Sequence, residues 1–281
     1  MKPQGIRDSL RRICWWLISV GLFLGFWELT YAMGLYSAQF LPPPHIFLAD
    51  IPNQLQHFDS SNINPGEEVE PSAVTAVLRT SLHSVRRVMA GLGMGFILGV
   101  ILGTLIRYFN VFGKLTLPVV TMLAPISPFA WLPVAVYLFG TGNGPAIFMV
   151  FLAVFFIIVL ATIAEIDTVN HTYLQVARIL GASHLQTYTQ VILPAMLPSL
   201  FMLLRLNLFG AWMIVLIAES AGSNSGLGTV VMLARNTGNS NLVMLGMLNI
   251  GIIGFLFDFA LRFVQRRLLH WVPELTATLK S

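Results

Sequence analysis

Charged residues are scarce in this chain of 281 residues. They make up 10% of the sequence, whereas 56% is hydrophobic, and the mean hydropathy is +0.77. A soluble domain usually has about 25% charged residues. Several apolar runs also reach the roughly 20 residues that a helix needs to cross about 30 Å of hydrocarbon. The scarcity of charge therefore excludes a soluble protein with a large core and indicates an integral membrane protein.

Cysteine and lysine are also rare. The single cysteine, Cys14, excludes an intrachain disulfide. Lysine occurs only three times, and most arginines flank apolar segments, where they anchor helices at the membrane surface. The net charge of +4 therefore gives no reason to expect a nucleic-acid partner.

Motifs for enzyme chemistry are missing. The six histidines are scattered without His-Glu-x-x-His spacing, and Asn224 stands where a nucleophile elbow would have serine. Gly113-Lys114 is followed by Leu115, so the chain has no Gly-Lys-Ser/Thr phosphate loop. We expect no catalytic residue, metal site or bound cofactor in this chain. Energy for uphill transport would then come from an ion gradient or from another subunit.

Six apolar segments are long enough to cross the membrane as helices. They cover residues 13–35, 86–106, 115–139, 145–164, 197–219 and 241–264. We predict an all-α integral membrane protein. It would have a cytoplasmic segment at 1–12, a retained first helix at 13–35 without a signal cleavage site, and an extracytoplasmic loop at 36–84. A five-helix core at 85–265, with a polar loop at 165–194, and a tail at 266–281 would follow.

The charges are distributed unequally between the two sides of these spans. With the N-terminus inside, eleven of the 16 basic residues fall in cytoplasmic segments. The first external loop instead holds Asp50, Asp59, Glu67, Glu68 and Glu70. The positive-inside rule therefore predicts that both termini and the 165–194 loop are cytoplasmic. Arg86 and Arg87 run against this bias, and we expect them to snorkel or to pair with the acidic loop.

Glycine and proline have distinct positions in the second and third spans. Glycines at 91, 95, 99 and 103 share one helix face, which predicts close packing against a neighbouring helix. The third span contains prolines at 118, 125, 128 and 133, each of which removes a backbone donor. Broken helix at membrane depth is tolerated only where it packs on protein or lines a wet cavity. We therefore expect the third span to line a pathway.

Four ionisable residues lie within the spans, where burial of charge is costly and often marks function. Glu28 lies near the outer end of the first span and is expected to be solvated. Arg205 and Glu219 are about 21 Å apart along one helix and cannot pair directly. Asp258 precedes Arg262 by four residues, so a local ion pair is expected.

The polar loop contains a spaced motif. QVA at 175–177 is followed by three residues, Gly181, nine residues and VILP at 191–194. This spacing resembles the cytoplasmic loop of ABC importer permeases, which reads Glu-Ala-Ala, three residues, Gly, nine residues, Ile-x-Leu-Pro. Gln175 departs from the pattern and lacks the carboxylate that the family would place there. We expect two short helices around a turn at Gly181, with Ser183 as N-cap, that dock into a groove of a cytoplasmic ATPase.

The residues expected to make this docking contact lie in or next to the motif. Small side chains would allow the closest approach, leucines would add apolar anchorage, and an arginine would meet an acidic rim. They are Gln175, Ala177, Arg178, Leu180, Gly181, Ala182, Leu185, Leu193 and Pro194.

Further stretches between residues 75 and 270, with LPPPHIFLADI before them, resemble one branch of these permeases. They include SLHSVRRVMAGLGMGFILGVILG, PISPFAWLPVAVYLFGTGN and WMIVLIAESAGSNSGLG. That branch imports nitrate, sulfonates, taurine or bicarbonate, and SAGSNSGLG is more similar to the sulfonate and taurine members. The resemblance implies a type I importer permease fold with a coupling-helix hairpin, in a bacterial inner membrane. It also implies a permease homodimer, two ATP-binding subunits that hold ATP and Mg²⁺, and an extracytoplasmic substrate-binding protein or domain.

Two groups of residues are expected to act on the substrate. The translocation pathway would be lined by Ser127, Pro128, Trp131, Arg205, Trp212 and Met213. The outer gate would be formed by Glu219, Ser223, Asn224 and Ser225. The alternative function is a secondary transporter driven by an ion gradient, which should show a symmetric repeat or midplane carboxylates. A third class, a membrane enzyme, would need a group of reactive side chains, and the sequence shows none.

Overall fold

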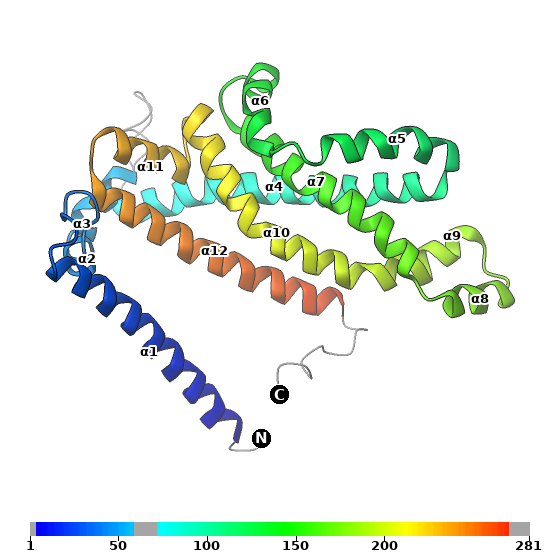
Figure 1. The fold of residues 1–281 in the computed structure, drawn as a ribbon, viewed down its shortest axis with the longest axis horizontal. Coiled ribbons are helices and arrows are strands. Elements are labelled where there is room, and N and C mark those ends of the chain that lie inside the picture. Colours follow the sequence, from blue (N-terminus) through cyan, green and yellow to red (C-terminus); the bar gives the residue numbers. More distant parts are fainter. Residues whose placement is uncertain (1–3, 59–71, 270–281) are drawn as a thin grey trace.

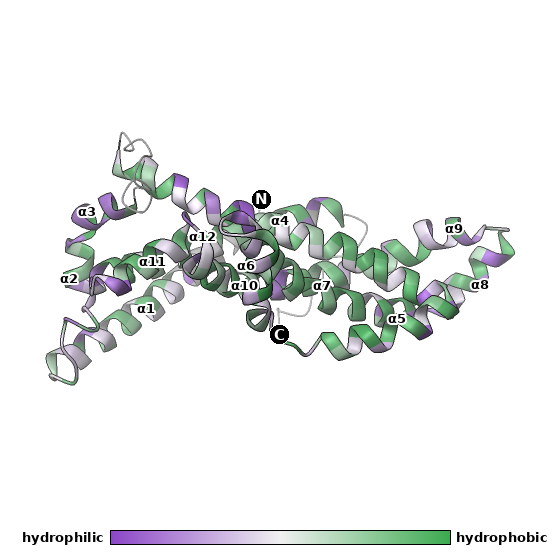
Figure 2. Cartoon of the chain, turned by 90° about the horizontal axis from the view of Figure 1, so that it is seen from above, coloured by the Kyte–Doolittle hydropathy of each residue, from purple (hydrophilic) through white to green (hydrophobic). Residues whose placement is uncertain are grey.

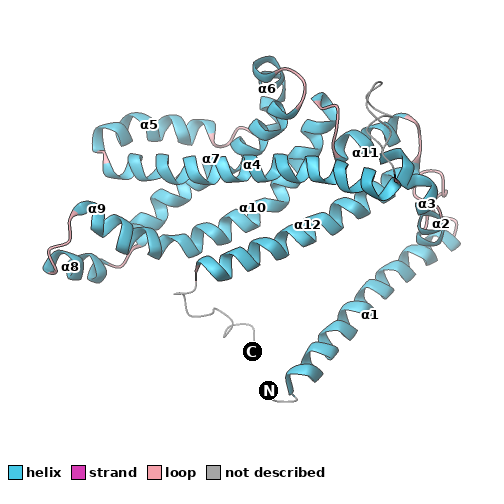
Figure 3. Cartoon of the chain, turned by 180° about the vertical axis from the view of Figure 1, so that it is seen from behind, coloured by secondary structure: helices cyan, strands magenta, loops and turns pink. Residues whose placement is uncertain are grey.

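The computed structural model describes residues 4–58 and 72–269, which form helices joined by loops and contain no strand (Figures 1 and 3). The predicted all-α class is therefore confirmed. The long helices are α1 (Gln4–Ala32), α4 (Ala73–Tyr108), α7 (Asn143–Thr168), α10 (Leu193–Gly222) and α12 (Ser240–Leu268). Shorter ones are α2 (Pro44–Ala49), α3 (Ile51–Gln54), η1 (Leu55–Phe58), α5 (Asn110–Leu123), η3 (Pro128–Trp131), α6 (Leu132–Phe139), α8 (His171–Ile179), α9 (His184–Thr187), η4 (Tyr188–Ile192) and α11 (Leu227–Asn236).

Among the described residues, five helical segments are long and apolar enough to cross a membrane by themselves. The predicted third span is not one continuous helix, which corrects the expectation for residues 115–139. It consists of α5 and the η3–α6 segment, bent by 97° relative to each other. Pro125 follows the end of α5, and Pro128 and Pro133 lie in the first turns of η3 and α6, where a missing N–H costs little. Pro118 lies inside α5.

Helix α4 is longer than the predicted second span. Its 36 residues extend about 54 Å, which exceeds the hydrocarbon thickness. The helix begins at a capping box, in which the Ser72 hydroxyl accepts from the Thr75 N–H and the Thr75 side chain bonds back to the Ser72 backbone. The loop was predicted to extend to residue 84, and its last part is instead the beginning of α4.

The glycine stripe of α4 packs directly against α7, as predicted. A Cβ at Gly91 would lie 2.6 Å from Val150, and one at Gly103 would lie 2.8 Å from the carbonyl oxygen of Val159. These distances leave no room for a side chain, so the two backbones approach each other at the closest practical distance. Helices α4 and α7 therefore form the rigid centre of the bundle.

The main core lies where α4, α7, α10, α11 and α12 meet. It includes Val88, Met149, Ile158, Leu208 and Leu242, each fully buried. A smaller apolar cluster joins α4, α5 and α7, and a third joins the start of α10 to the loop after α7. Figure 2 shows predominantly hydrophobic residues along α5 and α7, with hydrophilic residues in α3 and α8 at the two ends.

Helix α1 lies apart from this bundle. It diverges from α12 toward its N-terminus (Figures 1 and 3), and the apolar window of its membrane span is 0% buried. The helix begins at Gln4 and therefore includes most of the segment predicted as a cytoplasmic leader at 1–12. Glu28 was expected to be solvated, and its side chain is 40% exposed; its carboxylate forms a hydrogen bond with the ring of His45 near the start of α2.

The predicted extracytoplasmic loop contains short helices. Residues 44–58 form α2, α3 and η1. Asp50 accepts hydrogen bonds from Asn53, from Gln54 and from Asn241 of α12, which fastens this loop to the bundle. Asp59, Glu67, Glu68 and Glu70, as well as the tail from residue 270, lie outside the described residues.

Candidate functional site

The motif loop forms a helical hairpin at the end of the bundle opposite α2, α3 and α11 (Figure 1). Asn170 is the N-cap of α8, and its side chain accepts from the Thr172 N–H. The turn that follows requires glycine, because Gly181 has φ +71°. The Ala182 N–H then bonds to the Ala177 carbonyl oxygen, so the two sides of the turn are held together.

The second arm of the hairpin is not a separate helix, which corrects the prediction. Ser183 is the N-cap of α9 and forms a capping box with Gln186. The chain then continues without interruption through the π-helical turn η4 into α10. Pro194, which has no N–H to donate, lies directly after this π-helical turn, where the helical hydrogen-bond pattern changes. The hairpin is therefore an extension of a membrane helix, and a movement of one would move the other.

Most of the predicted docking residues lie on the open surface of the hairpin. Leu180 is 79% exposed and Leu185 is 72% exposed, while Gln175, Arg178 and Gly181 are also exposed. Ala182, Leu193 and Pro194 are half-buried. Ala177 was expected at the tightest contact with a partner, but it is 6% exposed and packs inside the hairpin. Its small size serves the internal fold of the hairpin.

A buried ion pair lies at the opposite end of the bundle. The Nη1 atom of Arg87 is 2.7 Å from Oε1 of Glu219, and both side chains are almost completely buried. Oε2 of Glu219 accepts from the Ser84 hydroxyl at 2.8 Å and from the Gly228 N–H at 2.9 Å. Nε of Arg87 donates to the side chain of Asn143. Both charges are therefore satisfied by several hydrogen bonds, as burial at this depth requires.

The pair also fixes the segment that joins α10 to α11. Arg87 donates to the carbonyl oxygen and to the hydroxyl of Ser225, and Ser223 donates to the same carbonyl. Gly226 and Gly228 lie so close to Glu219 and to the α10 backbone that neither position has space for a Cβ. Asn224 is exposed at the tip. The predicted gate residues are thus brought together, and Glu219 is their common attachment point.

The sequence did not predict the partner of Glu219. Arg87 was expected to snorkel or to pair with the acidic loop, and the structure shows that it is 2% exposed and points into the bundle. A signal was present, since an arginine and a glutamate both lay at outer ends of apolar spans. A sequence separation of 132 residues gave no means of joining them.

A second charged cluster joins α10 to α12 nearer the hairpin. Asp258 accepts from Arg205 of α10 and from Arg262 of α12, at 2.6 and 2.7 Å. The expected i,i+4 pair with Arg262 is present, and Arg205 is an additional partner. Arg205, which was predicted to line the translocation pathway, is therefore held in an ion pair between two helices.

The predicted pathway residues fall on different surfaces. Ser127, Pro128 and Trp131 lie at the break between α5 and α6, beside α7 and α10. Met213 is 69% exposed on α10. Trp212 is 4% exposed and packs edge-on against Phe257 of α12, so it belongs to the core and not to an open face.

These features define a multi-span membrane protein with a broken third span. The buried Arg87–Glu219 pair, here called the charged lock, lies at one end, and an exposed helical hairpin lies at the other. Residues 95–272 match the family described as the binding-protein-dependent transport system inner membrane component. The chain belongs to this family and is a permease of the ABC importer type.

Curated relatives agree with this assignment. A Methanocaldococcus jannaschii protein named as an ABC transporter permease is 32% identical over 197 residues, 70% of this chain and 74% of the relative. The taurine transport system permease of Escherichia coli is 28% identical over 91% of this chain and 89% of its own. The nitrate import permease of Synechococcus elongatus is 25% identical over 96% of both chains.

Solved structures show the same fold. An inward-facing methionine ABC transporter matches with a TM-score of 0.55 and 16% identity, covering 70% of this chain and 97% of that chain. A bacterial ABC transporter for the polysaccharide alginate matches with a TM-score of 0.55 and 14% identity, covering 86% and 98%. At these identities the likeness concerns the fold alone.

Proposed function

We propose that this chain forms the translocation pathway of an ATP-driven importer for a small oxyanion such as nitrate, bicarbonate, taurine or an alkanesulfonate. It acts as a homodimer with two ATP-binding subunits and an extracytoplasmic substrate-binding protein or domain, in a bacterial inner membrane with both termini cytoplasmic. ATP and Mg²⁺ are held by the partner subunits. The exposed hairpin at 171–187 is the observation that carries this proposal.

The hairpin has the properties of a docking element. Ile179, Leu180 and Leu185 are each more than two-thirds exposed on a segment that projects beyond the membrane spans. Large apolar side chains grouped on an aqueous surface indicate a binding site for another protein. Because α9 continues into α10, a push on the hairpin by an ATPase would be transmitted to a helix of the pathway.

The dimer and the pathway follow from surfaces that this chain leaves open. Helix α1 has no buried face in its membrane span, and Met213 and Phe209 of α10 are exposed. A second copy packed on these surfaces would enclose the break at 124–131. Broken helix ends in such a place would supply backbone groups to a solvated anion.

The substrate class rests on the relatives. Those with names for a substrate are permeases for taurine, nitrate and aliphatic sulfonates, all of which carry a small anionic oxygen group. A screen of the cognate binding protein over nitrate, bicarbonate, taurine and alkanesulfonates would select among them. Binding of none of the four, with binding of a cation or a sugar, would refute the oxyanion class.

The coupling role can be tested with two matched substitutions. Gly181 and Gly34 have φ +71° and +69°, and neither has an atom within 4 Å of a Cβ. Gly181→Arg and Gly34→Arg therefore carry a similar backbone strain, roughly 1–3 kcal/mol, but only the first alters the hairpin. We expect Gly181→Arg to lose co-purification with the tagged ATPase or to hydrolyse ATP without uptake, while Gly34→Arg retains both. Normal coupling in Gly181→Arg would show that the hairpin is only a connector.

The alternative is transport driven by an ion gradient. Glu219 and Asp258 are already engaged by arginines, so neither is a free carboxylate that could carry protons. Uptake into proteoliposomes supports the importer if this uptake requires enclosed ATP and persists after the ion gradients are collapsed. Uptake that needs a gradient and no ATP would replace it with the secondary transporter.

A further inference from the structure

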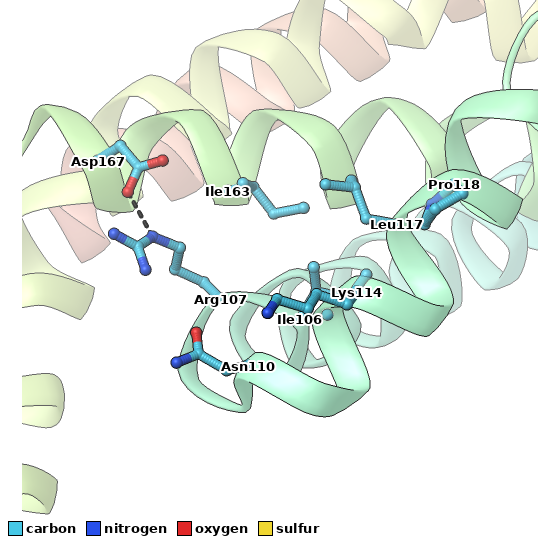
Figure 4. Close-up of a pocket in the computed structure, with 9 residues that line it drawn as sticks. Ile106, Arg107, Asn110, Lys114, Leu117, Pro118, Ile163 and Asp167 are labelled. Carbon is cyan, nitrogen blue, oxygen red and sulfur yellow. Dashed lines mark hydrogen bonds and ion pairs between the residues drawn. The ribbon is translucent and has the colours of Figure 1, made fainter.

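A cavity of about 320 Å³ lies between α4, α5 and α7, at the end of the bundle that carries the hairpin (Figure 4). Its polar lining includes Arg107, Lys114 and Asp167, and its apolar lining includes Leu117 and Ile163. Lys114 and Leu117 belong to α5 but lie before the break at 124–131, and none of these residues belongs to the hairpin contact or to the Arg87–Glu219 pair at the other end. The cavity therefore has no role in the function proposed above.

The charges at this cavity leave an excess of positive charge. Arg107 forms an ion pair with Asp167, which neutralises one of the two basic residues. The Lys114 side chain runs along the cavity toward Arg107 (Figure 4). Lys114 has no hydrogen bond or ion pair with any residue that the structure describes.

The remainder of the cavity is apolar. Leu117 and Ile163 face each other from α5 and α7, beyond the charged end (Figure 4). An inorganic anion would use only the charged end of such a space. A phospholipid uses both, because a phosphate and its acyl carbons are joined in one molecule at the boundary between water and hydrocarbon. Basic pockets between membrane helices on the cytoplasmic side are suited to anionic lipids of that leaflet.

We propose that this cavity binds the headgroup of an anionic phospholipid from the cytoplasmic leaflet. The phosphate lies between Lys114 and Arg107, and the first acyl carbons lie along Leu117 and Ile163. Asp167 precedes the α8 cap residue Asn170 by three positions. Lipid that draws Arg107 toward itself would therefore act on the base of the hairpin.

The test is lipid retention by the full-length permease. The protein is reconstituted in nanodiscs with equal amounts of phosphatidylglycerol and phosphatidylethanolamine. It is then released from the nanodiscs, and the mass of the protein with its bound lipid is measured by native mass spectrometry. We expect one phosphatidylglycerol per chain to be retained in preference to phosphatidylethanolamine. Lys114→Gln should reduce that preference about fivefold, because one basic residue near an anionic surface contributes on that order. Thermal unfolding of each variant shows whether it is folded.

Two variants serve as controls. Lys114→Arg keeps the charge at the cavity and should retain the lipid. Arg235→Gln removes an exposed charge at the opposite end, in the last turn of α11, and should leave retention unchanged. Equal loss in Lys114→Gln and Arg235→Gln would show attraction by overall charge and would overturn the site.

Two further outcomes would also overturn the proposal. Displacement of the lipid by millimolar inorganic phosphate would identify a site for the free anion. Loss of the lipid on addition of the ATP-binding subunit, together with weaker association of that subunit in Lys114→Gln, would show that a protein occupies the cavity. Retention of lipid in the assembled transporter supports the proposal, and it does so whichever substrate is imported.

Discussion

Arg87 and Glu219 are joined by a hydrogen bond of 2.7 Å although 132 residues separate them in the chain. The pair connects α4 to α10, and through Ser225 and Gly228 it also connects both to the start of α11. Two membrane helices and the segment between α10 and α11 are thus fastened at a single point. A conformational change that opens this end of the protein must break the pair or move all three elements together.

The first prediction concerns this pair. Glu219→Gln and Arg87→Met each leave one buried partner uncompensated, and removal of one member of a buried pair costs about 3–5 kcal/mol. We expect both variants to unfold at lower temperature in nanodiscs and to transport poorly. The double variant Arg87→Met/Glu219→Leu should recover part of the stability, because no charge remains buried.

Arg86→Met is the matched control, since Arg86 is the neighbouring residue and is exposed. It should change the unfolding temperature little. If the double variant loses as much stability as the two single variants together, the two sites are not coupled and the pair is not a structural lock.

The second prediction concerns the glycines beside Glu219. A Cβ at Gly228 would lie 2.8 Å from the Glu219 Cβ and in contact with the Leu216 carbonyl oxygen. Gly228→Ala should therefore destabilise the protein by about 1–3 kcal/mol, because backbone must move to admit a methyl group. Gly210→Ala, in the middle of α10, meets nothing within 4 Å and should be neutral or slightly stabilising. Equal melting temperatures for the two variants would contradict the observed packing.

A third prediction concerns the contact between α4 and α7. Gly103→Ala places a Cβ 2.8 Å from a backbone oxygen of α7, whereas Gly93→Ala on the other face meets nothing within 4 Å. The first should cost about 1–3 kcal/mol by overpacking, and the second should gain about 0.5–1 kcal/mol as glycine is replaced in a helix. Thermal unfolding of the full-length chain measures both. The proposal of a close backbone contact fails if Gly103→Ala is as stable as Gly93→Ala.

A fourth prediction concerns pH at the loop that holds α2 and α3, outside the membrane spans. Hydrogen bonds from Asn53, Asn241 and Gln54 hold the pKa of Asp50 below its usual value. Since the pKa is lowered in the folded protein, the stabilisation is fully present above the unfolded value of about 3.9 and is lost as pH falls through the folded pKa. The protection factors of the α2 and α3 amides, which correct for the slower intrinsic exchange in acid, should therefore fall below about pH 4.

Asp50→Asn should remove this dependence and leave exchange uniformly faster. Glu165→Gln, on α7 at the other end of the bundle, should leave the acid response of α2 and α3 as it is in the parent protein. An unchanged acid response in Asp50→Asn would assign the effect to another group.

The membrane spans and the hairpin were predictable because both depend on local sequence. Apolar runs of sufficient length form helices in hydrocarbon whatever surrounds them, since the backbone has no other hydrogen-bond partner. The turn at Gly181 and the cap at Ser183 also depend on neighbouring residues only. The glycine spacing of α4 predicted a packed face because a helix repeats regularly.

The tertiary structure decided which distant groups meet. No local rule pairs Arg87 with Glu219 or Arg205 with Asp258, because such pairs form only when helices are placed side by side. The 97° bend after α5 could not be predicted either, since prolines stop a helix without setting the direction of the next. Packing likewise placed Trp212 in the core and Ala177 inside the hairpin, because the burial of a helical residue is set by what lies against its face.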